Sequence, residues 1–348
     1  MTSDARQAII QRLFPQGIPA LWCPPLTHYA DDGTLDRERI AAHLATLAPH
    51  VKGMLVPGST GEGWEMSDEE QRQLLDLVLD LARELGFQVL VGALRPDAGD
   101  ARRLIADTLA WLDDRADATE SVDLLVASHV CGFAFCAPGG ADRTQEEIAD
   151  ALGAILDLRL PSALYQLPQV TDNEFAPETA ATLAERFSHL YLVKDSSGRD
   201  RVATSGLVPN DVFLVRGAEG DYIRWYKGAR GPYDGFLLST ANCFAPQLAG
   251  MIADADAGRL DAARAGSELV SRAIAGVFEL VDDLPFGNRY TNANKAIDHF
   301  LAHGPSAADL APPLLHSGER LPQAVIDATG RHLAQLGLLP SRGYLERC

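Results

Sequence analysis

A lysine at the end of a short apolar run has both the residue type and the setting that could do chemistry. Lys194 follows the run at residues 190–193 and precedes Asp-Ser-Ser-Gly at 195–198. Such a run predicts a strand buried on both faces. Burial disfavours the charged form of an amine, and a neutral amine can attack a carbonyl carbon to form a Schiff base. The alternative is a lysine whose stem lies along the protein while its ammonium group reaches water.

Three polar segments follow other apolar runs and could meet Lys194. Residues 58–62 read Gly-Ser-Thr-Gly-Glu, which could hold a carboxylate through hydroxyl and N–H groups or form an ordinary glycine-rich turn. Tyr165 ends another run, where its phenol could transfer protons or bond to the backbone inside the core. Residues 239–242, Ser-Thr-Ala-Asn, could position a substrate through Ser239 or cap the next helix.

The arrangement of apolar runs predicts the fold that would position these residues. Helical patterns separate most of the runs, and the spacing at 67–70 and at 144–147 is that of a capping box. Eight strands alternating with helices predict a (β/α)₈ barrel, whose strand ends all open on one face. An open doubly wound sheet would more often carry a Gly-x-Gly-x-x-Gly loop, which is absent after the first run. The eight runs are residues 18–22, 53–56, 88–91, 123–126, 163–165, 190–193, 212–215 and 235–238.

The chain beyond the last run is mainly helical in pattern and rich in alanine. We therefore expect residues 1–257 to form the barrel, with a short N-terminal helix, and residues 258–348 to form a C-terminal helical extension. Prolines at 305, 312, 313 and 322 should divide this extension into pieces.

Composition limits the partners that the chain could bind. The 348 residues carry a net charge of −18, which disfavours binding to nucleic acid or to an anionic membrane. No run reaches the roughly 18 apolar residues of a membrane span, and the N-terminus lacks a signal-peptide core. Five cysteines without a Cys-x-x-Cys pair favour reduced thiols in a cytoplasmic protein. The sequence predicts no metal site and no organic cofactor.

Three of these motifs carry a resemblance to a known family. The chain resembles the dihydrodipicolinate synthase and N-acetylneuraminate lyase family, the pyruvate-type class I aldolases. The family pattern is Gly-[Ser/Thr]-Thr-Gly-Glu, then Tyr-Asn-x-Pro, then Lys-[Asp/Glu]-x-[Ser/Thr]-Gly. Residues 58–62, 165–168 and 194–198 match it in that order.

The resemblance implies a role for each matching residue. Lys194 would form a Schiff base with a 2-oxo acid such as pyruvate, and Tyr165 would relay the proton. Ser59, Thr60 and Gly61 would bind the carboxylate, with Thr60 also taking part in catalysis. Asp195 should point away from Lys194, because side chains alternate along a strand. The resemblance further implies a homotetramer built from two tight dimers.

Departures from the family pattern concern the second substrate. Val170 stands where the synthases usually carry an arginine that binds a second carboxylate, and Gln166 replaces the usual asparagine. The Pro-Tyr-Tyr after strand four, whose second tyrosine acts from a neighbouring subunit, is expected to be replaced by residues 128–130. His129 could then bind substrate and carry a proton, or be an ordinary hydrogen-bonded histidine. The segment at 131–140 is expected to be an enlarged loop that suits a bulkier second substrate.

These observations favour a Schiff-base-forming lyase, an aldolase or dehydratase. Its substrate would be a 2-oxo acid such as pyruvate or a 2-keto-3-deoxy sugar acid. Two alternatives remain open at this stage. One is 4-hydroxy-tetrahydrodipicolinate synthase in lysine biosynthesis, which Val170 disfavours. The other is a barrel that binds a 2-oxo acid without turnover.

Overall fold

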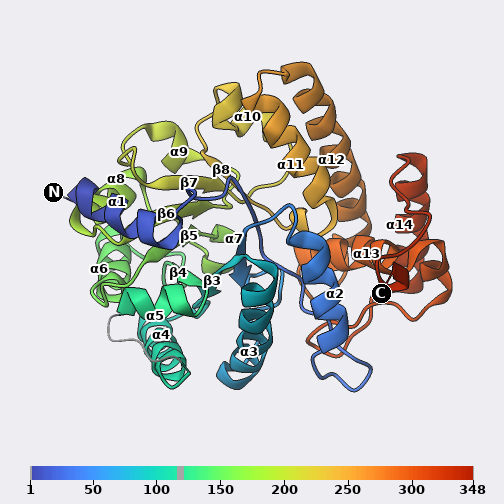
Figure 1. Cartoon of the computed structure of the whole chain (residues 1–348), viewed down its shortest axis with the longest axis horizontal. Helices are drawn as coiled ribbons and strands as arrows, with labels where there is room; N and C mark the ends of the chain where they lie inside the picture. Colours follow the sequence, from blue (N-terminus) through green and yellow to red (C-terminus); the bar gives the residue numbers. More distant parts are fainter. Residues whose placement is uncertain (1, 116–120, 348) are drawn as a thin grey trace.

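Eight parallel strands close into a barrel in the computed structural model of the chain (Figure 1). The structure describes residues 2–115 and 121–347. Each strand pairs with the next one along the chain, and β8 pairs with β1, which confirms the predicted (β/α)₈ barrel. The strands are β1 (Leu21–Cys23), β2 (Gly53–Val56), β3 (Gln88–Gly92), β4 (Val130–Cys136), β5 (Ser162–Gln166), β6 (Leu190–Asp195), β7 (Phe213–Arg216) and β8 (Gly235–Leu237).

Helices cover the outside of the barrel and form the C-terminal part of the chain (Figure 1). Both predicted capping boxes are present, at Ser67 with Glu70 and at Thr144 with Glu147. The α-helices are α1 (Thr2–Leu13), α2 (Arg37–Leu47), α3 (Asp68–Leu85), α4 (Ala98–Asp113), α5 (Ser121–Ala127), α6 (Gln145–Leu156), α7 (Pro168–Thr171), α8 (Pro177–Arg186), α9 (Arg201–Ser205), α10 (Tyr222–Trp225), α11 (Ala241–Asp256), α12 (Leu260–Val281), α13 (Arg289–His303) and α14 (Gln323–Gln335). Short 3₁₀ turns are η1 (Lys227–Ala229), η2 (Gly304–Asp309) and η3 (Leu345–Arg347).

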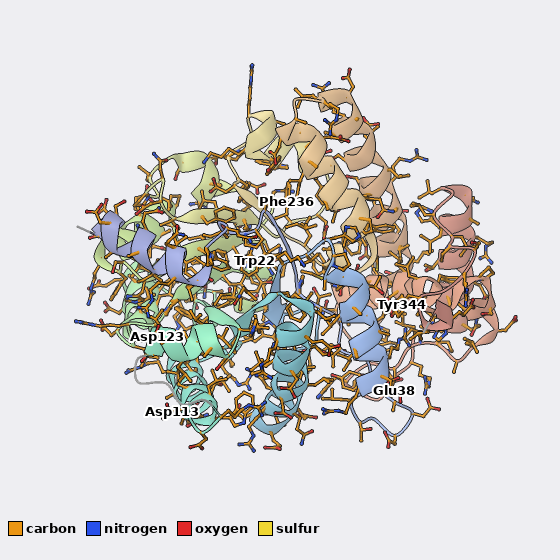
Figure 2. All side chains as sticks on the ribbon, in the orientation of Figure 1. Trp22, Glu38, Asp113, Asp123, Phe236 and Tyr344 are labelled. Atoms are coloured by element: carbon orange, nitrogen blue, oxygen red, sulfur yellow. The ribbon has the colours of Figure 1, made fainter. Side chains whose placement is uncertain are left out.

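The prediction for the fourth strand was wrong. Residues 123–126 belong to helix α5, and β4 is the stretch that was expected to be a loop. A short apolar run does not by itself distinguish a strand from a buried helix turn. Asp123 lies on this helix (Figure 2), where it pairs with Arg12 of α1. Gly132 within β4 is required because a Cβ there would lie 2.3 Å from the carbonyl oxygen of Pro161.

Helix α1 packs against the amino end of the barrel. Arg6 is almost fully buried, and its Nε donates to the carbonyl oxygen of Leu190 at the start of β6. Its guanidinium also pairs with Asp211 at 2.7 Å. Phe14, just after the helix, packs against Trp22 of β1 with ring centroids 5.9 Å apart. Helix α1 therefore does not cover the carboxyl end of the barrel, where Lys194 lies near the end of β6.

The last helices gather on the side of the barrel away from α1 (Figure 1). Helix α12 packs against α11, α13 and α14. The predicted division between residues 257 and 258 falls in the turn between α11 and α12. Among the described residues, no helix is long and apolar enough to cross a membrane. Four cysteines are free and buried, and Cys348 lies outside the described residues.

Candidate active site

The barrel brings Lys194 and Tyr165 together at the carboxyl ends of β6 and β5. The two residues are register partners on paired strands, and both are buried. The Lys194 Nζ lies 3.9 Å from the centroid of the Tyr165 ring. A cavity of about 30 Å³ opens beside them, and Ser59, Thr60 and Ser239 also line it. Five of the residues predicted from the sequence therefore share one cavity.

Lys194 has the properties of a nucleophilic amine. Burial lowers its pKa from the usual 10.5 to about 7, although nearby Cys136, Glu219 and Cys23 partly oppose the shift. Among the described residues, no acceptor takes a hydrogen bond from its Nζ. Since none of the residues that the structure describes forms an ion pair with the charged form, a large fraction of the amine is neutral near pH 7, as attack on a carbonyl requires.

Gly217 gives the Lys194 side chain the space that it occupies. The glycine follows β7, and its N–H donates to the carbonyl oxygen of Asp195 at 2.7 Å. A Cβ at this position would lie 2.8 Å from the Lys194 Cε and 2.0 Å from the Ser196 Oγ. Asp195 accepts a hydrogen bond from the Ser197 N–H, as expected of a carboxylate that points away from the lysine.

The Tyr165 phenol is suited to hold a proton until a strong base forms beside it. Burial raises its pKa, and the nearby Cys136 raises it further, whereas the hydroxyls of Ser59 and Ser196 oppose the rise. The Ser59 Oγ lies 3.5 Å from the Tyr165 Oη and accepts a hydrogen bond from the Trp64 Nε1 at 2.8 Å. The arrangement can carry a proton from one hydroxyl to the next.

The loop after β2 contributes Ser59 and Thr60 to the wall of the cavity. Among the described residues, no acceptor takes a hydrogen bond from the backbone N–H of Ser59 or Thr60. By contrast, the N–H of Gly61 donates to the carbonyl oxygen of Gly58 at 3.1 Å. Two adjacent N–H groups with the Ser59 and Thr60 hydroxyls form an anion-binding arrangement. Gly61 is required for space, because a Cβ there would lie 2.5 Å from the Pro25 carbonyl oxygen. Its predicted direct binding role is therefore not supported.

The C-terminal helix α13 fixes the position of this loop. The Asn288 Nδ2 donates to the carbonyl oxygen of Ser59 at 3.2 Å, and the Thr291 Oγ1 donates to that of Thr60 at 3.0 Å. Lys295 and Glu62 form a fully buried ion pair at 2.6 Å. These contacts join the barrel and the extension directly at the site.

A carboxylate holds Ser239 on the far side of the cavity. The Ser239 Oγ donates to one Glu219 oxygen at 2.6 Å, which also accepts the Thr240 N–H at 3.0 Å. The other Glu219 oxygen accepts from the Tyr222 Oη at 2.8 Å. Because its own proton is engaged, the Ser239 hydroxyl presents lone pairs to the cavity, and these can accept from a hydroxyl of a bound molecule.

His129 does not belong to this site. It precedes β4, and its carbonyl oxygen accepts from Val89 near the amino end of the strand. At about 3.3 Å per residue, roughly 20 Å of strand separates it from the end beside Tyr165. The residues that follow β4 are Ala-Pro-Gly-Gly at 137–140, so this segment and not 128–130 takes the place of Pro-Tyr-Tyr. The predicted enlarged loop is likewise wrong, because its aromatic residues, Phe133 and Phe135, lie within β4.

Gln166 and Val170, which replace the usual asparagine and arginine of the family pattern, have different surroundings. Gln166 bonds to Phe175 through both side-chain atoms, accepting its N–H at 2.9 Å and donating to its carbonyl oxygen at 3.0 Å. It therefore stabilises the loop after β5. Val170 lies on α7 with 46% of its surface exposed. Lys194 is the one cationic side chain among the described residues that line the cavity.

Four residues near the cavity were not predicted from the sequence: Ser196, Gly217, Glu219 and Tyr290. Ser196 and Gly217 could have been suspected, because each lies within two residues of the end of β6 or β7. Tyr290 comes from α13. The sequence marks residues 288–292 as an unusually polar segment, but it favours Arg289, and not Tyr290, as the candidate for a carboxylate or inter-subunit contact. Arg289, beside it, pairs instead with Asp282 at 3.0 Å.

One buried group elsewhere could hold a metal by distance alone. His28, His43 and Asp298 place ligand atoms within 4.8 Å of one another. The His43 Nε2 donates to the Asn242 carbonyl oxygen, which leaves its Nδ1 to accept from the His28 Nε2 at 3.0 Å. Asp298 pairs with the Arg39 guanidinium at 3.1 Å. The group is therefore explained as a hydrogen-bonded network between α2 and α13.

Comparisons with known proteins relate this chain to one enzyme family. Residues 129–281 match the model of the dihydrodipicolinate synthetase family. A 4-hydroxy-tetrahydrodipicolinate synthase of Agrobacterium fabrum is 27% identical over 68% of this chain and 73% of its own. The synthase of Acidothermus cellulolyticus is 30% identical over 55% of this chain and 57% of its own.

Solved structures share the fold across most of the chain. YagE of E. coli, a prophage protein solved in complex with pyruvate, superposes with a TM-score of 0.69 at 18% identity. The match covers 92% of this chain and all of YagE. A 2-keto-3-deoxygluconate aldolase variant of Sulfolobus solfataricus, bound to 2-keto-3-deoxygalactonate, gives 0.68 at 16% identity over 92% of this chain and 96% of its own.

The family match and the curated relatives agree with a lyase of the class I aldolase type. The match covers residues 129–281, which include Tyr165 and Lys194, and it agrees with the resemblance predicted from the motifs.

Proposed function

We propose that this protein is a Schiff-base-forming lyase in which Lys194 attacks the ketone of a 2-oxo acid. The observation that carries the proposal is a buried amine with a pKa of about 7, beside the unused N–H groups of Ser59 and Thr60. A 2-oxo acid places a carboxylate next to its ketone. The N–H groups would hold the carboxylate while the ketone carbon lies within reach of the Lys194 Nζ.

Tyr165 is the proposed general acid and base. Attack by the amine gives a carbinolamine, and its hydroxyl must be protonated before it can leave as water. Tyr165 would donate that proton, which leaves an iminium that can accept electrons from a neighbouring bond. Aldol cleavage, aldol addition and dehydration all share this intermediate.

The lining of the cavity favours a substrate whose far end carries hydroxyls and no second carboxylate. No arginine lines the cavity among the described residues, and the Glu219 carboxylate lies beside Ser239. A second carboxylate would find no cation there, whereas a hydroxyl could donate to the Ser239 Oγ. A 2-keto-3-deoxy sugar acid has this pattern, as does the molecule bound in the Sulfolobus aldolase. The synthase of lysine biosynthesis, after which the curated relatives are named, is the second candidate.

Reductive trapping tests the proposal. The protein is incubated with pyruvate and then with borohydride, and the modified peptide is identified by mass spectrometry. We expect the reduced pyruvyl group on Lys194, and no adduct with Lys194→Ala. Absence of an adduct from pyruvate and from a panel of sugar-derived 2-oxo acids would refute the Schiff base.

Turnover distinguishes an enzyme from a barrel that only binds. We expect release of pyruvate from a 2-keto-3-deoxy sugar acid, or its dehydration, and a loss of roughly 10²-fold or more in Tyr165→Phe. An adduct that forms without turnover of any partner would favour the binding protein. A cytoplasmic location and a homotetramer are further parts of the proposal.

A further inference from the structure

One wall of the cavity comes from outside the barrel. Tyr290 lies in the first turn of α13 and lines the same cavity as Lys194, Tyr165 and Ser59. Its ring packs edge-on against Phe278 of α12, with centroids 5.3 Å apart. The residue is partly exposed, so it contacts both the cavity and solvent.

The first turn of α13 is hydrogen-bonded to the loop that carries Ser59 and Thr60. Asn288 caps α13 by accepting the Thr291 N–H at 2.9 Å, and its Nδ2 donates to the Ser59 carbonyl oxygen. Thr291 bonds to the carbonyl oxygen of Thr60. Tyr290 therefore lies between two residues that are tied to the very loop that carries Ser59. These hydrogen bonds on either side of Tyr290 hold it beside the cavity.

The surroundings of Tyr290 keep its phenol protonated. Burial raises its pKa, and the nearby Glu219 raises it further, whereas the Arg289 guanidinium partly opposes the rise. The pKa values of the Tyr290 and Tyr165 phenols are thus both raised, with burial as the largest cause. Both groups can hold a proton at neutral pH and give it up only when a stronger base forms nearby.

The segment after β4 offers no phenol to the site. Residues 137–140 read Ala-Pro-Gly-Gly, so no tyrosine stands there to reach a neighbouring subunit. We propose that Tyr290 supplies the second phenol of the proton relay from within the same chain, between Tyr165 and solvent. This proposal rests on the proposed Schiff-base function of Lys194.

The proton balance of the relay is simple. When the carbinolamine forms its iminium, the carbon–oxygen bond breaks and Tyr165 gives its proton to the departing hydroxyl, which leaves as water. The Tyr165 phenolate takes a proton from Ser59, whose Oγ lies 3.5 Å away. Ser59 would then take the proton of Tyr290, which lines the same cavity. Tyr290 regains a proton from water at the barrel mouth. Removal of a proton from the methyl carbon of bound pyruvate runs the same path toward solvent.

Exchange of the pyruvate methyl protons in D₂O measures this path without a second substrate. We would follow the loss of the methyl signal by proton NMR at saturating pyruvate for the wild type, Tyr290→Phe and Tyr226→Phe. Tyr226 is the matched control because its Oη bonds to Asp256 at 2.9 Å outside the cavity. We expect Tyr290→Phe to slow exchange by roughly 10-fold or more, and Tyr226→Phe to leave it within about twofold.

Borohydride trapping separates the possible results. In Tyr290→Phe, the Lys194 adduct should still reach the wild-type yield after long incubation, because the amine is intact. Tyr290→His, which again offers a proton carrier, should exchange faster than Tyr290→Phe. An unchanged saturating rate in Tyr290→Phe would overturn the relay, and so would a defect confined to the KM for pyruvate. If the wild type gave neither adduct nor exchange, the Schiff-base function itself would fail and the relay with it.

Discussion

At the scale of single residues, the central property is the unpaired amine of Lys194. Its pKa of about 7 arises from burial, and among residues 2–115 and 121–347 no carboxylate forms an ion pair with it. Burial of the amine destabilises the folded protein, but it also makes the amine more reactive at neutral pH. Tyr165 has the opposite shift, so the two groups would start the proposed reaction with the amine largely neutral and the phenol protonated.

This pKa predicts how Schiff-base formation depends on pH. Below about pH 7 most of the Lys194 amine is protonated and cannot attack, whereas above it the neutral amine predominates. The initial rate of trapping with pyruvate and borohydride should therefore rise from pH 5.5 to about 7.5 and then level off. A rate that kept rising toward pH 10 would show an ordinary exposed lysine.

Gly217→Ala should slow Schiff-base formation by displacing the Lys194 side chain, although the lysine itself is unchanged. The added methyl group would overlap the Lys194 Cε and the Ser196 Oγ, so the lysine must leave its position. We expect adduct formation to fall by 10-fold or more, since misplacement of about 1 Å can cost that much or more. Gly250→Ala is the control, because it lies in α11 with nothing near the new methyl group. Equal trapping by both variants would contradict this role for Gly217.

At the scale of elements, the important contact joins the loop after β2 to α13. The Glu62–Lys295 pair is buried at the centre of this contact, and the Lys295 Nζ also donates to the Leu314 carbonyl oxygen at 2.8 Å. The His316 N–H donates to the second Glu62 oxygen at 2.8 Å. The loop that would hold the substrate carboxylate is thus part of the interface with the extension.

Lys295→Met should destabilise the protein far more than loss of a surface pair. The variant leaves the Glu62 carboxylate buried without its cation, which should cost about 3–5 kcal/mol of unfolding free energy. Lys227→Met removes an exposed lysine that pairs with Asp234, and it should cost less than about 1 kcal/mol. Urea unfolding of both variants measures the contrast. Similar midpoints for the two would contradict the structural role of the buried pair.

The elements also show how far the sequence could predict the structure. Seven of the eight expected strands overlap observed ones, and the lysine of the sixth lies where strand order and motif predicted. The fourth failed because residues 123–126 form an apolar turn of α5, while Gly132 and the aromatic residues made β4 resemble a loop. Tyr290 and Glu219 could not be predicted, because their places depend on how α13 packs and on the turn after β7.

At the scale of the whole molecule, the cavity described is built from one chain. Lys194, Tyr165, Ser59 and Tyr290 all come from the same polypeptide. We nevertheless expect four chains to associate, as the family resemblance implied. Light scattering coupled to size exclusion should give a mass near four times the 37.4 kDa of one chain. A single-chain mass at micromolar concentration would refute the tetramer.

The bond between the loop after β2 and helix α13 has a consequence for synthesis on the ribosome. Some 230 residues separate Glu62 from Lys295, and the helix leaves the ribosome only after every barrel strand has been made. A nascent chain with a complete barrel would therefore hold Lys194 beside a loop that still lacks its bonds to α13. The proposed carboxylate site would be completed only after α13 has emerged and packed against that loop.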